Sequence, residues 1–257
     1  MTKEKAEEYA KVSVIDKSFL CNYIFGADDI VICVGRDGLV CNTMKYLTDR
    51  NPVIGINPDP SRWDGVVLPF SVADLTWLLP AVCEDKAQIP SQKVTFAHAV
   101  TQNGQEMYAA NDIFVGPASH ISARYDICYN GKCEKQSSSG VIISTGLGQS
   151  GWYKSIIAQV KGSARYLEME ECEYEAIDWG DRELSFAVRE PYPSICTGAD
   201  IVMGKIKYGE SLVLRSNMPE NGVIFSDGIE DDYIEFNSGT EVTISVAEKQ
   251  GNLLIRG

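Results

Sequence analysis

Residues 137–155 read Ser-Ser-Ser-Gly-Val-Ile-Ile-Ser-Thr-Gly-Leu-Gly-Gln-Ser-Gly-Trp-Tyr-Lys-Ser, and the rest of the chain can be interpreted outward from this stretch. The β-branched run Val141–Ile143 predicts a buried strand, and the residues after the loop have a helical pattern. Between strand and helix, Gly146, Gly148 and Gly151 fall at the spacing G-x-G-x-x-G. Glycine lacks a Cβ and tolerates positive φ, and the start of a helix favours negative charge, so such a loop can hold an anion. The stretch therefore predicts a strand, an anion-binding loop and a helix.

Two other interpretations of this glycine spacing stay open. In a chain with 22 glycines, the match is also expected from an ordinary strand-to-helix turn. A dehydrogenase fingerprint would need a βαβ unit and an acidic residue about 20 positions further on. Glu168 or Glu170 could supply that acid, but the segment after Val160 does not clearly return to a buried parallel strand.

Length and charge limit the classes of function. The 257 residues, of which 44% are hydrophobic, can form one large domain or two ordinary ones. The formal net charge of −13 follows from 23 basic and 36 acidic side chains, and the sequence has no long basic block. We therefore expect neither a nucleic-acid partner nor a membrane surface. A bound anion has to be met locally, by glycine loops, helix ends or single basic side chains.

The cysteine pattern and the N-terminus indicate a cytoplasmic protein. The eight cysteines form no C-x-x-C pair, and several lie in apolar contexts, which favours reduced thiols over a zinc cluster or a disulfide framework. They are Cys21, Cys33, Cys41, Cys83, Cys128, Cys133, Cys172 and Cys196. The charged N-terminus has no apolar core of signal-peptide length, and no stretch reaches 18 apolar residues, so we expect neither export nor a membrane span.

The first 90 residues predict an α/β lobe. The apolar run Asp29–Val34 is expected to be a strand, and Gly35–Gly38 forms a glycine–acid turn before a helix over Leu39–Leu47. A second strand is expected over Pro52–Asn57, which completes a βαβ unit with a right-handed crossover. Ligands of such sheets bind at the carboxyl ends of the strands, here Gly35–Gly38 and Asn57–Asp59. Helices are also expected over residues 3–24 and within residues 70–83.

After a boundary near residue 90, the pattern changes to short strands separated by turns. Asn130-Gly131 lies between Arg124–Tyr129 and Lys132–Glu134, and this dipeptide predicts a hairpin with a type I′ turn. The other expected strands are Val94–Val100, Ile113–Val115, Ser185–Arg189, Ser211–Arg215, Val223–Phe225, Glu241–Val246 and Leu253–Arg256. The sequence thus predicts an α/β lobe over residues 1–90 and a mostly antiparallel β-rich lobe over residues 91–257.

Several of these stretches, in this order, resemble motifs of the NAD kinases, which phosphorylate the 2′-hydroxyl of the adenosine ribose of NAD. The turn Gly35-Arg36-Asp37-Gly38-Leu39 resembles the family's glycine-glycine-Asp-Gly-Thr turn, and Asn111-Asp112 matches its Asn-acid pair. The loop over residues 145–152 loosely resembles its Thr-Pro-Thr-Gly-Ser-Thr-Ala-Tyr loop.

The divergent branch typified by the mitochondrial NAD kinase is the most similar one. Residues 53–60, 134–140 and 188–191 resemble that branch, as does Asp227-Gly228 followed by residues 234–237. The resemblance covers roughly residues 29–257. It implies a two-domain fold of the NAD kinase and diacylglycerol kinase type, with a small Rossmann-like N-terminal lobe and an antiparallel β-rich C-terminal lobe. In such a fold the last C-terminal residues can complete the first lobe.

The resemblance also implies roles for individual residues. Asp37 would be the catalytic base or would hold the metal ion, in line with what phosphoryl transfer requires. Asn111 and Asp112 would bind the adenine and ribose of the acceptor. The remaining nucleotide-binding residues implied are Gly35, Arg36, Gly38 and Asn57 on the donor side, and Thr145, Gly146, Gly148, Ser150, Gly151, Trp152 and Ser155 along the dinucleotide. ATP as donor, Mg²⁺ as cofactor and a homodimer are implied as well.

Two positions depart from the family pattern. Arg36 stands where the family has a second glycine, and Leu39 replaces a residue with a hydroxyl group. A guanidinium at position 36 would either obstruct the donor phosphates or bind them with its own N–H groups. The sequence therefore leaves two functions open: an active kinase, and a catalytically weak homologue that binds NAD, NADP or another nucleotide as a sensor.

Overall fold

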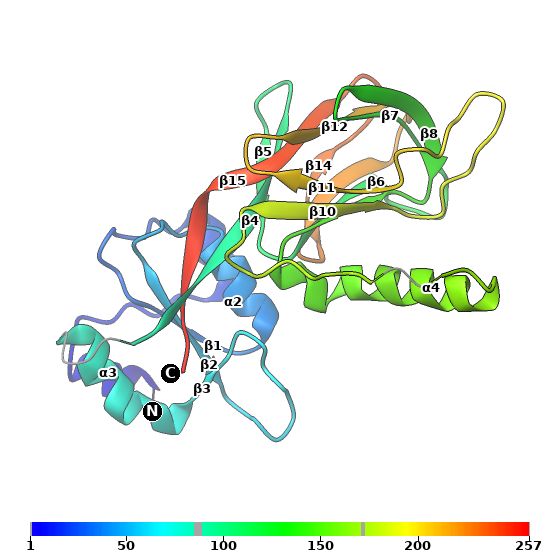
Figure 1. Ribbon diagram of the computed structural model, residues 1–257. Coiled ribbons are helices and arrows are strands. Elements are labelled where there is room, and N and C mark those ends of the chain that lie inside the picture. The colour runs from blue at the N-terminus through cyan, green and yellow to red at the C-terminus, as the bar shows by residue number, and fades with distance from the viewer. Residues whose placement is uncertain (1, 85–88, 171–172, 257) are drawn as a thin grey trace. The chain divides into compact units, whose positions relative to one another are not determined.

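The computed structural model describes residues 2–84, 89–170 and 173–256 (Figure 1). The chain divides into two compact units, the first formed by residues 1–94 and 249–257 and the second by residues 95–248. The fold is mixed α/β and rich in β-structure, as predicted, with two sheets. The division lies close to the boundary expected near residue 90, and the C-terminal residues belong to the first unit.

The first unit contains the expected parallel strand pair. Strands β1 and β2 are parallel, with Val31 opposite Val53, and helix α2 connects them. The other edge of β2 pairs in parallel with the end of β15 and with β3. The elements are α1 (Thr2–Glu7), the 3₁₀ helix η1 (Lys17–Asn22), β1 (Val31–Val34), α2 (Asp37–Met44), β2 (Pro52–Asn57), β3 (Phe70–Ser71), the 3₁₀ helix η2 (Val72–Asp74), α3 (Leu75–Cys83) and the end of β15 (Glu241–Leu254). The apolar side chains of β2, β3 and α3 form the core of this unit.

The helix expected over residues 3–24 is wrong for most of its length. Helix α1 ends at Glu7, and only the short 3₁₀ helix over Lys17–Asn22 follows. The intervening residues include Val12, Val14 and Ile15, whose β-branched side chains lower helix propensity. The carboxylate of Asp16 then accepts the N–H of Ser18 and starts the 3₁₀ helix as its N-cap.

The second unit consists of strands from two sheets that pack face to face. One group runs in the order β5, β4, β15, β12, β7, β8, and the other sheet in the order β11, β10, β9, β6, β13, β14. The elements are β4 (Ser91–Thr101), β5 (Glu106–Ala109), β6 (Asp112–Pro117), β7 (Ala123–Tyr129), β8 (Lys132–Ser138), β9 (Val141–Ser144), the 3₁₀ helix η3 (Leu147–Ser150), α4 (Trp152–Tyr166), β10 (Glu183–Val188), β11 (Met203–Lys207), β12 (Ser211–Ser216), β13 (Gly222–Ser226), β14 (Ile229–Glu235) and the first part of β15.

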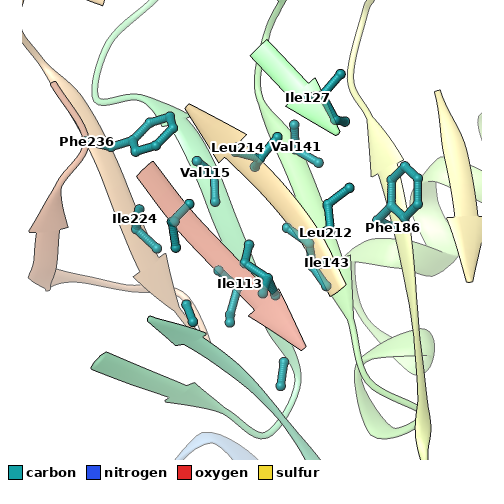
Figure 2. Close-up of a cluster of buried hydrophobic side chains, with 14 of the residues drawn as sticks. Ile113, Val115, Ile127, Val141, Ile143, Phe186, Leu212, Leu214, Ile224 and Phe236 are labelled. Carbon is teal, nitrogen blue, oxygen red and sulfur yellow. The ribbon is translucent and has the colours of Figure 1, made fainter. Parts of the chain in front are cut away.

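The core of the second unit lies between these strand layers. Figure 2 shows Leu212 and Leu214 of one layer pointing toward Ile113 and Ile143 of the other. These side chains are fully buried, and each such aliphatic side chain contributes about 1.5–3 kcal/mol through the removal of its surface from water. The alternating apolar pattern that predicted the strands is therefore explained by this inner surface.

The hairpin between β7 and β8 confirms one prediction and corrects another. Asn130 and Gly131 have φ angles of 48° and 75°, as a type I′ turn requires. This register places Cys128 directly opposite Cys133, and the two form a disulfide, so the prediction of reduced thiols is wrong for this pair. Short spacing around a two-residue turn brings the two residues together even without a C-x-x-C motif. Five other cysteines are free thiols, and Cys172 lies outside the described residues.

The strand before the glycine loop does not belong to a βαβ unit. Strand β9 lies between β6 and β10 and is antiparallel to both. Helix α4 follows the loop and runs along this six-stranded sheet, where Tyr153 packs against Phe114 and Ile142 on its outer face (Figure 1). Since a dinucleotide fingerprint requires a parallel return strand, the dehydrogenase interpretation of the glycine spacing is wrong for this fold. Among the described residues, no helix is both long and apolar enough to cross a membrane.

Candidate functional site

In the first unit, the glycine–acid turn lies at the carboxyl end of β1, where α2 begins. The N–H of Gly35 donates to the carbonyl of Ile56, which fixes the start of the turn to β2. A Cβ added at Gly35 would lie 2.9 Å from the side chain of Leu39, whereas one at Gly38 would meet no atom within 4 Å. The surface over Gly38 is therefore open to a ligand. Leu39, which replaces the hydroxyl-bearing residue of the family motif, packs its side chain against Gly35.

Asp37 is the first residue of α2, and its side chain is half-buried. Its Oδ1 atom accepts the N–H of Val67 at 2.8 Å, and this hydrogen bond leaves Oδ2 unused by the loop. The carboxylate is thus oriented by the protein and keeps one oxygen for a proton or a cation. The helix was expected from Leu39, but it begins two residues earlier, at Asp37, within the predicted turn.

The loop after β2 contacts this turn through Trp63 and Val67. The guanidinium of Arg36 lies 4.8 Å from the ring centre of Trp63, an arrangement that favours a cation–π attraction. Asn57, which is buried, donates from Nδ2 to the carbonyl of Trp63 and accepts the N–H of Asp59 at Oδ1. The side chain of Asn57 therefore holds the loop in place. Arg36 is exposed at the turn, so of these two predicted residues it is the one accessible to a ligand.

The turn offers one carboxylate, that of Asp37, to the implied Mg²⁺. Within the described parts of the chain, no three Asp, Glu, His or Cys side chains gather as a metal site. Magnesium in phosphoryl-transfer sites is commonly held by one or two carboxylates together with substrate phosphates and waters. Asp37 alone fits such a site, with the remaining ligands supplied by phosphate oxygens and water.

In the second unit, the residues before β6 and after β9 are tied together through their backbones. The carbonyl of Asn111 accepts the N–H of Thr145 at 2.9 Å and its Oγ1 at 3.2 Å. Thr145 Oγ1 also donates to the carbonyl of Ala110 at 2.5 Å and accepts the N–H of Gly148 at 3.2 Å. Thr145 is therefore the link that joins the Asn111–Asp112 segment to the glycine loop.

The glycines of the loop serve close packing within the protein. A Cβ at Gly146 would lie 2.2 Å from the carbonyl oxygen of Asp178, and one at Gly148 would lie 2.0 Å from that of Asn111. None of the three glycines has a positive φ. The N–H groups of Gly148 and Gly151 donate to Thr145 and to the carbonyl of Gly148, so neither is open to an anion.

The residues at the start of α4 differ in how far they are available to a ligand. The ring of Trp152 stacks on Phe114 at 5.6 Å, and the guanidinium of Arg189 lies 5.4 Å from its centre. Ser150 Oγ donates to the carbonyl of Leu147, while Ser155 is exposed. Trp152 is thus half-buried against the sheet, and its packing on a base or nicotinamide ring stays a prediction.

The structure adds Asp227 to the segment around Asn111. Its carboxylate accepts the N–H of Asn111 at 2.7 Å, that of Ala110 at 3.1 Å and that of Asp112 at 3.3 Å. The N–H of Asp227 in turn donates to the carbonyl of Asp112 at 2.9 Å. In the sequence, Asp227-Gly228 stood out as a similarity to the mitochondrial branch, but its partners lie more than a hundred residues away, and no local pattern assigns them.

Asp112 is nearly buried, and its environment alters its acidity. Burial raises the pKa of its carboxyl group to about 7, and the neighbouring charge of Asp227 adds to this increase. A carboxyl group with this pKa is partly protonated near neutral pH. It can then donate as well as accept a hydrogen bond, which differs from the ionised acceptor expected from the sequence.

The predicted site residues thus form two clusters, one in each unit. Gly35, Arg36, Asp37 and Gly38 lie together at one turn, with Asn57 supporting the loop beside it. Asn111, Asp112, Thr145, Gly146 and Gly148 lie together around the start of β6, and Ser150, Gly151, Trp152 and Ser155 lead from that point into α4.

Comparison with known proteins shows which proteins this chain is similar to. No protein-family model matches the chain. A probable NADH kinase of Oryza sativa subsp. japonica is 25% identical over 225 residues, which cover 78% of this chain and 63% of the rice protein. The crystal structure of yeast NADH kinase complexed with NADH has the same fold, with a TM-score of 0.64 at 14% identity, over 89% of this chain and 62% of the yeast chain. The chain thus spans less than two thirds of either protein. The similar sequence and the shared fold together support a relationship between this chain and the NAD kinase family.

Proposed function

We propose that the chain is an NAD(H) kinase, which transfers the γ-phosphoryl group of ATP to the 2′-hydroxyl of the adenosine ribose of NAD or NADH. The observation that supports this most strongly is the similarity to the rice probable NADH kinase over 78% of the chain. The similarity thus covers more of the chain than either compact unit contains, so it extends into both units. Both residue clusters thus belong to a chain that resembles a kinase over most of its length.

The clusters have the chemistry that the two substrates require. Around Gly38, an open backbone, the guanidinium of Arg36 and the start of α2 suit the phosphates of ATP. Around Asn111, a carboxamide offers one acceptor and two donors, which suits an adenine edge or a ribose hydroxyl. In this proposal the first unit binds the donor, and the second unit binds the dinucleotide.

The transfer itself needs one base and one leaving group. The 2′ oxygen of the ribose forms a bond to the γ-phosphorus of ATP, while the bond from that phosphorus to the bridging oxygen breaks and ADP leaves. The hydroxyl proton passes to the free Oδ2 of Asp37, whose Oδ1 stays hydrogen-bonded to Val67. If Oδ2 of Asp37 instead holds Mg²⁺, the ion would neutralise charge on the phosphates, and the hydroxyl proton would pass to water.

A nucleotide-binding homologue without kinase activity is the second candidate. The observation in its favour is the packing of Arg36 against Trp63 and of Leu39 against Gly35, at positions where the family motif has a glycine and a hydroxyl-bearing residue. In this second proposal, the guanidinium occupies space that the donor phosphates need, while the Asn111 cluster still binds a dinucleotide.

One experiment on the purified chain separates the two candidates. NAD or NADH is incubated with Mg²⁺ and each of several phosphate donors, and NADP(H) is detected by a coupled dehydrogenase assay. Binding of each nucleotide is measured in parallel by titration calorimetry. Formation of NADP(H) supports the kinase, whereas tight binding of NAD(H) without product supports the binding module. A chain that neither binds nor converts NAD(H) contradicts both.

A further inference from the structure

Asp227 lies at a hairpin turn whose geometry is unusual for a residue with a side chain. It connects β13 to β14, and its φ of 55° and the φ of 70° at Gly228 are those of a tight two-residue turn. Aspartate tolerates this region better than most residues, but glycine would adopt it at lower cost. An aspartate here is therefore explained by what its side chain does.

The side chain of Asp227 holds the backbone that precedes β6. Its two carboxylate oxygens accept three consecutive N–H groups, those of Ala110, Asn111 and Asp112, at 3.1, 2.7 and 3.3 Å. Hydrogen bonds to an ionised acceptor are about twice as strong as neutral ones. The backbone N–H of Asp227 also bonds to the carbonyl of Asp112, so the two segments are joined at four points.

The opposite side of the same segment is equally fixed. The carbonyl of Asn111 is held by the N–H and the hydroxyl of Thr145, and Gly148 packs so closely on it that a Cβ would lie 2.0 Å away. The main chain of Asn111 is thus bound on both sides. Its carboxamide makes no hydrogen bond to any described residue, although it is half-buried. A fixed backbone with an unused carboxamide is the arrangement of a group held ready for a ligand.

We propose that Asp227 is a positioning residue that holds Ala110–Asp112 so that the carboxamide of Asn111 is presented to the acceptor dinucleotide. This inference rests on the proposed function for the identity of the ligand. Asp227 acts through Asn111 and does not itself contact the nucleotide in this account. The nearly buried carboxyl group of Asp112 packs beside it and belongs to the same supporting layer.

The test uses five proteins: the wild type, Asp227→Asn, Asn111→Ala, the double variant and a control variant. Asparagine keeps the size of the side chain and also tolerates positive φ, so Asp227→Asn removes the charge and one acceptor oxygen without forcing the turn to change. Asp231→Asn is the matched control, because Asp231 is an exposed acid on the adjoining strand β14. Amide hydrogen exchange is followed at residues 110–112, and dissociation constants for NAD and ATP are measured by calorimetry.

If Asp227 positions this segment, Asp227→Asn should accelerate amide exchange at residues 110–112 by about tenfold, and it should weaken NAD binding by about tenfold with ATP binding within about twofold of wild type. The double variant should bind NAD no more weakly than Asn111→Ala alone, since both changes remove the same interaction, that between the Asn111 carboxamide and NAD. Asp231→Asn should leave all three measurements unchanged.

Several outcomes would overturn the inference. Unchanged exchange at residues 110–112 in Asp227→Asn contradicts the positioning role whether or not the chain binds NAD. Additive losses in the double variant show that Asp227 acts independently of Asn111, which also contradicts it. A wild-type chain that binds no NAD(H) refutes the proposed function and the ligand named here. In a chain that does bind, unchanged NAD affinity in Asp227→Asn refutes this inference alone.

Discussion

Asp37 is the residue on which the proposed chemistry depends, and its contacts allow a clean test. Asparagine at this position can still accept the N–H of Val67, so the loop should keep its structure, but it cannot take a proton. We expect Asp37→Asn to lower kcat by about 100-fold or more, with nucleotide affinities close to wild type. Steady-state kinetics and calorimetry measure both, and Asp64→Asn, an exposed acid in the same loop, is the control. Turnover at the wild-type rate would remove Asp37 from its assigned role.

The raised pKa of Asp112 leads to a prediction about stability. In the unfolded chain this carboxyl group ionises near its ordinary pKa of about 3.9, whereas in the folded chain it keeps its proton up to about pH 7. Between these values the folded state binds more protons, so its stability falls as the pH rises, and the effect levels off above about pH 7. Asp112→Asn lacks this group and should lack this slope.

Denaturant unfolding at pH 5 and pH 8 measures the effect. Relative to Asp112→Asn, the wild type should lose about 2–3 kcal/mol of unfolding free energy between the two pH values. The comparison with the variant cancels the contribution of other titrating groups, provided that Asp227, the acid that faces Asp112, remains in both proteins. A difference that does not change with pH would show that Asp112 ionises normally in the folded chain.

At this scale, the sequence predicts residues within local motifs but not their distant partners. Asp37 could be assigned because a strand, a turn and a helix surround it, and Asn111 because of its resemblance to a family pair. The contact between Asp227 and Asn111 joins residues separated by 116 positions, and it depends on a strand order that no local pattern encodes. The glycine spacing predicted an anion-binding loop, whereas the nearest neighbours of Gly146 and Gly148 are backbone carbonyls of the protein itself.

Among the elements, the glycine loop and helix α4 offer a matched pair of substitutions. A methyl group at Gly148 would collide with the carbonyl of Asn111, so Gly148→Ala should destabilise the chain by about 2–3 kcal/mol. Gly162 lies within α4 with no atom near its added Cβ, so Gly162→Ala should stabilise it by about 0.5–1 kcal/mol. Chemical denaturation measures both. Equal stability of the two variants would contradict the packing described for the loop.

Elements with a strong local pattern were predicted well, and those that depend on tertiary contacts were not. Pro52–Asn57 forms β2 with the predicted bounds, because its apolar run is buried in the sheet. The helix over residues 3–24 failed because β-branched residues interrupt it. The segments Glu241–Val246 and Leu253–Arg256 were predicted as two separate strands. The residues between them are also extended, so a single strand, β15, runs from Glu241 to Leu254. The disulfide in the β7–β8 hairpin follows from the strand register that the Asn130-Gly131 turn sets. The sequence predicted this turn but not the pairing of Cys128 with Cys133.

For the whole molecule, the change from an α/β pattern to short alternating strands was enough to predict the fold class and a division into two parts. The return of β15 to the parallel strands of the first unit is a non-local pairing, with Leu253 opposite Val53, and was predicted only through the family resemblance. The fold alone does not distinguish a kinase from a protein that only binds nucleotides, because the same fold can carry different functions.

The most direct measurement of the central claim is the identity of the product formed by the purified chain. NADH or NAD is incubated with ATP and Mg²⁺, and the dinucleotide is isolated and examined by mass spectrometry and ³¹P NMR. The proposed function predicts one added phosphate, on the 2′ oxygen of the adenosine ribose, with equimolar ADP and with no product from Asp37→Asn. Recovery of unmodified dinucleotide from a chain that binds both substrates would contradict the account.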